Sequence, residues 1–177
     1  MSINRKVILY IAMSLDGFIA KSDGDISFLS QVEQEGEDYG YSTFTETVDT
    51  IILGRKTYDK LLSMGFDAYY GDRSVFVLTR SPHSAIDKIT FYSGSLSELI
   101  SSLKGQPGKH IYCDGGAETV NRLLQDKLLD ELIISIIPIL LGDGVRLFGK
   151  SFPGQKLQLV SSKSFEKGLV QLHYIRV

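Results

Sequence analysis

The sequence predicts an α/β fold, with a central mixed, mostly parallel sheet that is flanked by helices and ends in an antiparallel C-terminal hairpin. Three observations predict it. Apolar runs rich in β-branched and aromatic residues alternate along the chain with helical or turn-rich segments. The run at 6–13, KVILYIAM, is apolar after its first residue, as in a central strand covered on both faces. The segments 156–162 and 169–177 alternate apolar and polar residues around a turn at 166–168, which indicates an antiparallel hairpin.

The first strand, at 6–13, ends at the turn signal SLDGFIA, and the segment 22–27 has the composition of a loop. Between 30 and 47, apolar residues are scattered among many acids, so we expect an irregular helix over the sheet there. Further strands are expected at 49–54, 74–79, 89–92, 109–113 and 131–138.

Two helices in the second half of the chain are marked by sequence signals at their first residues. Ser95 is followed three residues later by Glu98, which is the pairing of a capping box, so a helix is expected at about 96–104. A second helix is expected at about 117–126, where apolar residues recur with helical spacing after a pair of glycines.

The length and composition are those of one ordinary globular domain. A chain of 177 residues can bury a sizeable core without disulfides or metals, and no internal repeat or Pro-rich linker divides it. Apolar residues make up 43% and charged residues 23%, which excludes a disordered or fibrous class. We therefore expect a single domain over residues 1–177.

Charge and apolar patterning exclude several partners. The 19 basic and 21 acidic residues give a net charge of −2 with no block of like charges, so no binding to nucleic acid or an anionic membrane is expected. The longest apolar run, at 132–141, is too short to span a bilayer, and Asp16 interrupts the N-terminal apolar stretch too early for a signal peptide. The single Cys113 lies in an apolar run, as expected of a buried, inert thiol in a reducing compartment. We expect a cytoplasmic protein.

Three polar or glycine-bearing segments each follow a predicted strand. In open α/β sheets, ligands bind in the crevice beyond the carboxyl ends of the strands. The first segment follows TIIL and opens a helix, whose first N–H groups, two cations and a hydroxyl suit a phosphate. It lacks the upstream glycine and loop spacing of a Walker sequence. This segment is Gly54, Arg55, Lys56 and Thr57.

The other two segments suit different phosphates. Thr79, Arg80 and Ser81 follow Leu78 at a strand end, and one guanidinium with two hydroxyls suits the 2′-phosphate that separates NADPH from NADH. In the third segment, paired glycines before a helix let a pyrophosphate approach the backbone. The third segment is Asp114, Gly115, Gly116, Ala117, Glu118 and Thr119.

Each segment also has a structural interpretation. Arg55, Lys56 and Arg80 are consistent with solvated loop charges or helix-start salt bridges. Gly115 and Gly116 are consistent with a tight strand-to-helix turn. The coincidence of all three segments at predicted strand ends favours anion binding.

Other polar and aromatic residues show weaker patterns. His83, His110 and His173 are scattered without metal-ligand spacing, so no metal site is predicted. Six aromatic residues either line an aromatic substrate pocket or form core or dimer contacts. These are Tyr39, Tyr41, Phe44, Phe66, Tyr69 and Tyr70.

The order of the motifs resembles a known superfamily. AMSLDGFIA, TIILGRKTYDKL, FVLTRSP, YCDGGAETVNRLL and DELIISIIPILLGDGVRLF follow one another over almost the full length of the chain. This combination resembles the dihydrofolate reductase-like superfamily, and most closely the branch that contains the reductase domain of riboflavin biosynthesis. The resemblance implies a three-layer fold with NADPH lying across the strand ends.

The resemblance also implies a role for each motif. Ala12 and the SLDG loop would lie beside the nicotinamide, and the segment 54–57 would hold the phosphates. Residues 78–81 would meet the 2′-phosphate, and residues 114–119 would take the pyrophosphate. Gly142, Asp143 and Gly144 would close the site near the nicotinamide. The implied reaction is hydride transfer to a small conjugated heterocycle. The implied assembly is a homodimer paired through a sheet edge, for which the run IISIIPILL either supplies apolar surface or lies wholly inside the protein.

The chain departs from the superfamily where a proton donor is expected. Dihydrofolate reductases carry a carboxylate on the first helix, and here Glu33, Glu35, Glu37 and Asp38 are candidates outside any matching motif. Folate reduction is therefore not predicted. With one cysteine and no zinc-ligand pattern, a stand-alone, divergent reductase is expected, and the alternative is a non-catalytic NADPH-binding protein.

Asp16 is the best single candidate for a polar contact at the reacting centre, because it follows the first strand in the loop implied to lie beside the nicotinamide. The alternative is an Asp-Gly turn residue that caps its own backbone. Hydride transfer needs positioning and exclusion of water more than acid–base help, so an enzyme needs no further catalytic residue here.

Overall fold

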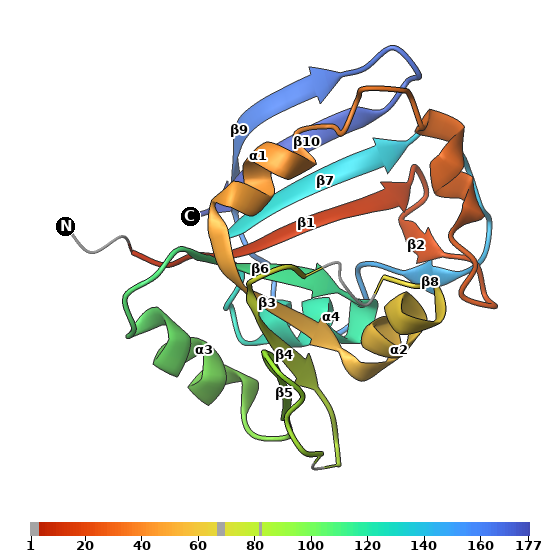
Figure 1. Ribbon diagram of the computed structural model, residues 1–177. Helices are drawn as coiled ribbons and strands as arrows, with labels where there is room; N and C mark the ends of the chain where they lie inside the picture. Colours follow the sequence, from red (N-terminus) through yellow and green to blue (C-terminus); the bar gives the residue numbers. More distant parts are fainter. Residues whose placement is uncertain (1–3, 67–69, 82) are drawn as a thin grey trace.

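The computed structural model describes residues 4–66, 70–81 and 83–177 (Figure 1). Within these residues, an eight-stranded sheet has the order β5-β4-β3-β6-β1-β7-β10-β9, and β2 pairs with β8 in a small second sheet. The strands are β1 (Val7–Ser14), β2 (Phe18–Ala20), β3 (Val48–Gly54), β4 (Ser74–Leu78), β5 (Ile89–Tyr92), β6 (His110–Gly115), β7 (Glu131–Ile137), β8 (Val145–Arg146), β9 (Leu157–Ser164) and β10 (Val170–Arg176).

The sheet is mixed and mostly parallel, as the sequence predicts. Neighbouring strands from β5 to β7 are parallel, whereas β10 runs antiparallel to both β7 and β9. The predicted C-terminal hairpin is confirmed. Because β7 lies between β1 and β10, the run IISIIPILL forms no sheet edge, and β5 and β9 are the edges instead.

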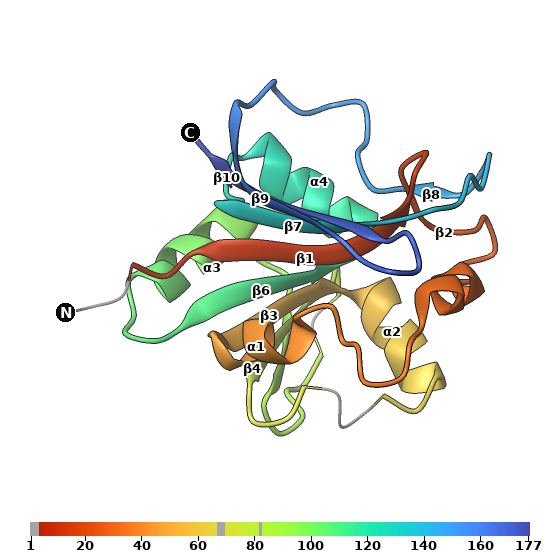
Figure 2. The same cartoon turned by 90° about the horizontal axis from the view of Figure 1, so that it is seen from above.

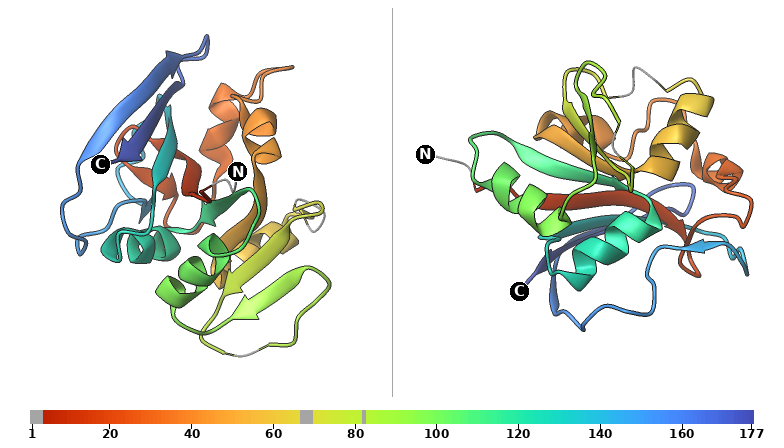
Figure 3. Two further views of the ribbon diagram at one scale, coloured as in Figure 1. Left: turned by 90° about the vertical axis from the view of Figure 1, so that its left-hand side faces the viewer. Right: turned by 90° about the horizontal axis from the view of Figure 1, so that it is seen from below.

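Helices cover both faces of the sheet (Figures 2 and 3). One face packs against α3 and α4, and the other against α1 and α2. Side chains of a strand alternate between the faces, so Leu9 of β1 joins the first core and Ile8 joins the second. The helices are the 3₁₀ helix η1 (Ser27–Val32), α1 (Tyr41–Glu46), α2 (Arg55–Ser63), α3 (Leu96–Lys104) and α4 (Ala117–Gln125).

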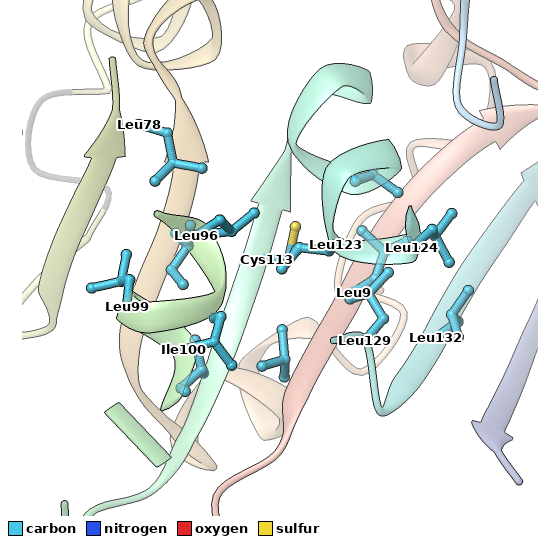
Figure 4. Close-up of a cluster of buried hydrophobic side chains, with 14 of the residues drawn as sticks. Leu9, Leu78, Leu96, Leu99, Ile100, Cys113, Leu123, Leu124, Leu129 and Leu132 are labelled. Atoms are coloured by element: carbon cyan, nitrogen blue, oxygen red, sulfur yellow. The ribbon is translucent and has the colours of Figure 1, made fainter. Parts of the chain in front are cut away.

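The core under α3 and α4 is almost entirely aliphatic (Figure 4). Of the predicted capping box at α3, the structure shows the N-cap hydrogen bond, in which Oγ of Ser95 accepts from the Glu98 backbone N–H at 3.4 Å. Cys113 lies in this core with 0% of its surface exposed, and burial raises the pKa of its thiol to about 12. The thiol is therefore protonated at neutral pH, as expected for an inert cysteine.

The prediction of one irregular helix at 30–47 is wrong. The 3₁₀ helix η1 ends at Val32, and α1 begins only at Tyr41. Between them, Gly36, Tyr39 and Gly40 have φ values of 78°, 58° and 86°, which a right-handed helix cannot contain. The short strands β2 and β8 were not predicted, because two or three residues carry no readable period. No helix among the described residues has the length and apolar character needed to cross a membrane.

Candidate functional site

The three predicted phosphate segments lie side by side at the carboxyl ends of β3, β4 and β6, which are neighbours in the sheet. In the parallel register, Gly54 of β3 pairs with Leu78 of β4, and Leu53 pairs with Gly115 of β6. The carboxyl ends of three neighbouring strands therefore carry 54–57, 78–81 and 114–119 to the same place, which is where open α/β sheets bind ligands.

The first turns of α2 and α4 approach each other closely. Gly54 and Gly116 are their N-cap residues, and neither helix has a side-chain cap. A Cβ on Gly116 would lie 2.9 Å from Oγ1 of Thr57, and one on Gly54 would lie 3.1 Å from Oγ1 of Thr119. The peptide bond between Gly115 and Gly116 is cis. Two helix N-termini without side-chain caps thus lie together, an arrangement that suits an anion.

The segment after β4 contributes an exposed cation. The Arg80 side chain is 93% exposed, and its Nη2 lies 3.4 Å from Oε1 of Glu118 in the first turn of α4. A long contact between two exposed groups stabilises little, so the guanidinium can exchange this partner for a phosphate. Oγ1 of Thr79 accepts a hydrogen bond from the Ser81 backbone N–H at 3.2 Å. The Leu78 side chain packs into the core instead (Figure 4).

Arg55 is already engaged with neighbouring side chains. Its Nε donates to Oδ1 of Asp59 at 2.7 Å, and its Nη1 lies 3.1 Å from Nε2 of His83. The guanidinium also lies over the Phe91 ring, 5.3 Å from the centroid. These contacts link α2 to β5, and sequence spacing could not have revealed them. Lys56 is exposed at the same helix start.

Asp16 ties together two loops at the end of β1. Its Oδ1 accepts from the Ser14 hydroxyl at 2.6 Å and the Leu141 backbone N–H at 3.1 Å, and its Oδ2 accepts from the Gly142 N–H at 2.7 Å. The Ser14 hydrogen bond is the main cause that lowers the pKa of Asp16 to about 2. The carboxylate therefore holds the segment after β7 against the SLDG loop.

The predicted segment 142–144 begins at the Gly142 N–H that Asp16 binds. Oδ2 of Asp143 accepts from the Ser22 hydroxyl at 2.8 Å. Gly144 has a φ of 147°, and a Cβ there would lie 2.2 Å from the Ala20 carbonyl oxygen. Only glycine allows the chain to pass β2 so closely.

A cavity of about 630 Å³ lies beside Ala12 on the α1 face of the sheet. All four carboxylates that the sequence offered as proton donors line it. Of the six aromatic residues considered for a pocket, Tyr39 lines it, whereas Tyr41, Phe44 and Tyr70 belong to the core under α1 and α2. Tyr69 lies outside the described residues. The lining residues are Tyr10, Ala12, Leu29, Val32, Glu33, Gln34, Glu35, Glu37, Asp38, Tyr39, Ser135, Ile137 and Leu169.

A polar network joins three lining residues of this cavity to Gln171, which does not line it. Nε2 of Gln171 lies within hydrogen-bond distance of Oη of Tyr10 at 3.0 Å, the Tyr39 carbonyl oxygen at 3.1 Å and Oγ of Ser135 at 3.2 Å. The Tyr10 hydroxyl donates to the same carbonyl at 2.8 Å, and burial raises its pKa. Sequence reasoning missed Ser135 and Gln171, since each is one polar residue in a predicted strand.

The Asp114 side chain is buried next to the glycine turn. Its Oδ1 accepts from the Tyr112 hydroxyl at 2.6 Å, and its Oδ2 has no hydrogen-bond partner among the described residues. Burial raises the pKa of the Asp114 carboxyl to about 7. Within the segment 114–119, this side chain thus lies in the interior, while the backbone of the glycines forms the turn.

Comparison with known proteins places the chain in a family. Residues 68–171, more than half of the chain, match the RibD C-terminal domain family. The chain belongs to this family. The uncharacterised protein YwjB of Bacillus subtilis is 46% identical over 175 residues, which cover 97% of this chain and 98% of YwjB.

Solved structures of other proteins share the fold of this RibD C-terminal domain. A Shewanella protein named for riboflavin biosynthesis superposes with a TM-score of 0.89 at 33% identity, covering 100% of this chain and 99% of that one. Dihydrofolate reductase from Enterococcus faecalis, complexed with NADP(H), superposes with a TM-score of 0.67 at 18% identity over 99% of each chain. At that identity the second likeness shows the fold alone. It confirms the dihydrofolate reductase-like fold that the sequence predicts.

Proposed function

We propose that this RibD C-terminal domain protein is an NADPH-dependent reductase that transfers hydride to a small conjugated heterocycle. The observation that carries the proposal is the pair of helix N-termini, at α2 and α4, which meet at glycines whose Cβ would lie 2.9 Å from Oγ1 of Thr57 and 3.1 Å from Oγ1 of Thr119. Closely approaching helix N-termini that begin at glycines suit a pyrophosphate.

The neighbouring residues fit the rest of NADPH. The exposed Arg80 guanidinium, with Thr79 and Ser81, provides the charge and hydroxyls for the 2′-phosphate. Ala12, at the end of β1, lies at the wall of the large cavity, so a nicotinamide beside it would face a substrate there. Bound NADPH supplies the hydride, and the protein supplies position and exclusion of water.

We assign the exchange of protons during the reaction to residues that line the cavity. In the structure, the Asp16 carboxylate accepts three hydrogen bonds from Ser14, Leu141 and Gly142, which supports a positioning role for Asp16. Glu33 and Glu35 line the cavity and have exposed side chains, so they can exchange protons with solvent. We assign the acid–base role, where one is needed, to this group.

The proposal is tested by titrating the purified protein with NADPH and with NADH, while following nicotinamide fluorescence and thermal stabilisation. Strong preference for NADPH is expected, and binding of neither would reject the cofactor site. NADPH oxidation that depends on an added acceptor is then expected across a panel of pyrimidine-like and pteridine-like compounds. Tight NADPH binding without turnover across that panel would favour a non-catalytic NADPH-binding protein.

A further inference from the structure

The cavity beside Ala12 is large enough for a one- or two-ring molecule. Its base combines apolar side chains, such as Ile137 and Leu169, with the polar group of Ser135, which is 5% exposed. Oγ of Ser135 lies 3.2 Å from Nε2 of Gln171, and the Ser135 hydroxyl, which both donates and accepts, lines the cavity. The base therefore suits the edge of a polar ring.

The mouth of the cavity is strongly acidic. Four of its lining residues are carboxylates, and no Lys, Arg or His is among the described residues that line it. Hydrogen bonds from Ser42 lower the pKa of Asp38, so this carboxylate is charged at neutral pH. The nearby Lys167 ammonium donates to the Glu33 carbonyl oxygen rather than to a cavity carboxylate. Oε1 of Glu37 accepts from the Tyr39 backbone N–H at 2.7 Å, but no cation among the described lining residues balances the four negative charges.

Apart from the nearby Lys167, the cations of the site lie outside the cavity lining. Arg55, Lys56 and Arg80 stand at the strand ends of β3 and β4, where the cofactor phosphates are proposed to bind. A phosphate on the substrate would face like charges from Glu33, Glu35, Glu37 and Asp38, which disfavour its binding. A positive charge would be attracted by the same groups.

We propose that this cavity takes a cationic, phosphate-free nitrogen heterocycle, whose C=N nitrogen is protonated or alkylated. The proposal rests on the proposed reductase function and names its substrate class. The positive charge makes the ring carbon electron-poor. When that carbon receives the hydride from NADPH, a C–H bond forms, the C=N π bond breaks, and its electron pair moves onto nitrogen. The cation becomes a neutral amine and NADPH becomes NADP⁺, so no further proton is required.

The carboxylates also favour the reactive form of such a substrate. An opposite charge nearby raises the pKa of a protonated imine, since it stabilises the charged form. Glu33, Glu35 and Glu37 would therefore increase the fraction of the cation in the cavity.

The test uses three two-ring probes of similar size that differ in charge. N-methylquinolinium is a permanent cation, quinoline is neutral at pH 8, and quinoline-6-carboxylate is an anion. Their affinities are measured by isothermal titration, with the protein first without cofactor and then saturated with NADP⁺. The cation is expected to bind at least about ten-fold more tightly than quinoline, with the anion weakest. Added salt should weaken binding of the cation and leave that of quinoline nearly unchanged.

Two variants locate the effect. Glu35→Gln and Glu37→Gln should each weaken N-methylquinolinium roughly three- to ten-fold without changing quinoline. Glu98→Gln is the matched control, because Glu98 lies on α3 at the opposite face and the substitution makes the same change in net charge.

Equal affinity for the three probes, tighter binding of the anion, or no binding of any probe at millimolar concentration would overturn the proposal. Probe binding involves no turnover, and cofactor preference is measured separately. A protein that prefers NADPH but shows no charge preference in the cavity would retain the reductase proposal and lose this one. A protein that binds the cation but neither cofactor would retain the charge preference of the cavity and lose the reductase proposal.

Discussion

The backbone N–H of Gly116 donates a hydrogen bond to Oγ1 of Thr57 at 2.9 Å. This bond joins the first turn of α4 to the first turn of α2, which are separated by about sixty residues in the sequence. A Cβ on Gly116 would lie 2.9 Å from the same hydroxyl oxygen, so a side chain there would force Thr57 or the backbone to shift. Thr57 therefore links the two helix N-termini directly.

Thr57→Val should weaken NADPH binding, because valine keeps the shape of threonine but cannot accept the Gly116 hydrogen bond. We expect a loss of about 1 kcal/mol in the free energy of unfolding and about ten-fold in NADPH affinity. Urea denaturation and fluorescence titration measure the two effects. Thr57→Ser keeps the hydroxyl and should behave like the unaltered protein. If both variants bind NADPH normally, the tie has no role in the cofactor site.

Arg80→Ala should reduce affinity for NADPH roughly 10- to 100-fold and leave NADH nearly unchanged, because only NADPH carries the 2′-phosphate. Stability should hardly change, since the Arg80–Glu118 pair is exposed. Parallel titrations with the two cofactors measure this preference. Arg122→Ala, which removes an exposed arginine from α4, is the control for net charge. Equal weakening of NADPH and NADH would rule out the assigned role of Arg80.

Asp16→Asn should loosen the segment after β7. Amide hydrogen exchange at Leu141 and Gly142 should become faster, because the carboxylate accepts both N–H groups. Asp143→Asn, which alters only the contacts to Ser22 and Gly144, should leave these two amides protected. A fall in kcat with unchanged exchange at both amides would instead identify Asp16 as a group that contacts the reacting centre.

Asp16 should also contribute to stability in acid. Its folded-state pKa, about 2, lies below the ordinary value of 3.8, so the contribution is present above pH 4 and is lost as the pH falls towards 2. Acid unfolding of Asp16→Asn should therefore begin at a higher pH than that of the unaltered protein. Coincident unfolding curves would show that the carboxylate makes no such contribution.

Asp114 should have the opposite dependence on pH. Burial raises its folded-state pKa to about 7, so the folded protein retains a proton that the unfolded chain releases above pH 4. Stability should therefore fall as the pH rises from 4 to 7 and then level off, by at most about 4 kcal/mol. Asp114→Asn removes the charge and should flatten this part of the profile, making the variant relatively more stable at pH 8 than at pH 5. Glu98→Gln should keep the slope, and a slope that survives Asp114→Asn would assign it to another group.

The edge strand β9 should mediate self-association. Leu157, Leu159 and Val160 are 44%, 50% and 51% exposed there, which is unusual for neighbouring apolar residues at an unpaired edge. We expect sedimentation at micromolar concentration to show a homodimer, twice the 19.7 kDa of the chain. Leu159→Glu should shift the dimer to monomer, whereas Leu62→Glu, at an exposed leucine of α2, should not. A single 19.7 kDa species for the unaltered protein would contradict the expectation.

Local patterns in the sequence predicted the elements that depend on neighbouring residues. The apolar run at 6–13, the Ser95–Glu98 capping box and the alternation on either side of 166–168 correspond to β1, α3 and the β9–β10 hairpin. The positions of the three glycine-bearing or polar segments after strands could also be predicted, because glycines, cations and hydroxyls after a strand are visible without knowing which strands are neighbours. Parallel pairing of β3 with β4 and β6 then brought them together.

The cavity could not be predicted in the same way. Its lining combines β1, η1, the segment 33–38 and β7 with Leu169, which directly precedes β10, and these parts are joined only by sheet order and by packing. The segment 33–38 falls within the helix that the sequence predicts at 30–47, where apolar residues are scattered among many acids. Positive φ values at Gly36, Tyr39 and Gly40 turn it over the sheet instead. Chain reversals and strand order depend on the free energy of the whole packed core, which no local pattern in the sequence reveals. Residues that are distant in the sequence therefore form one cavity only in the folded protein.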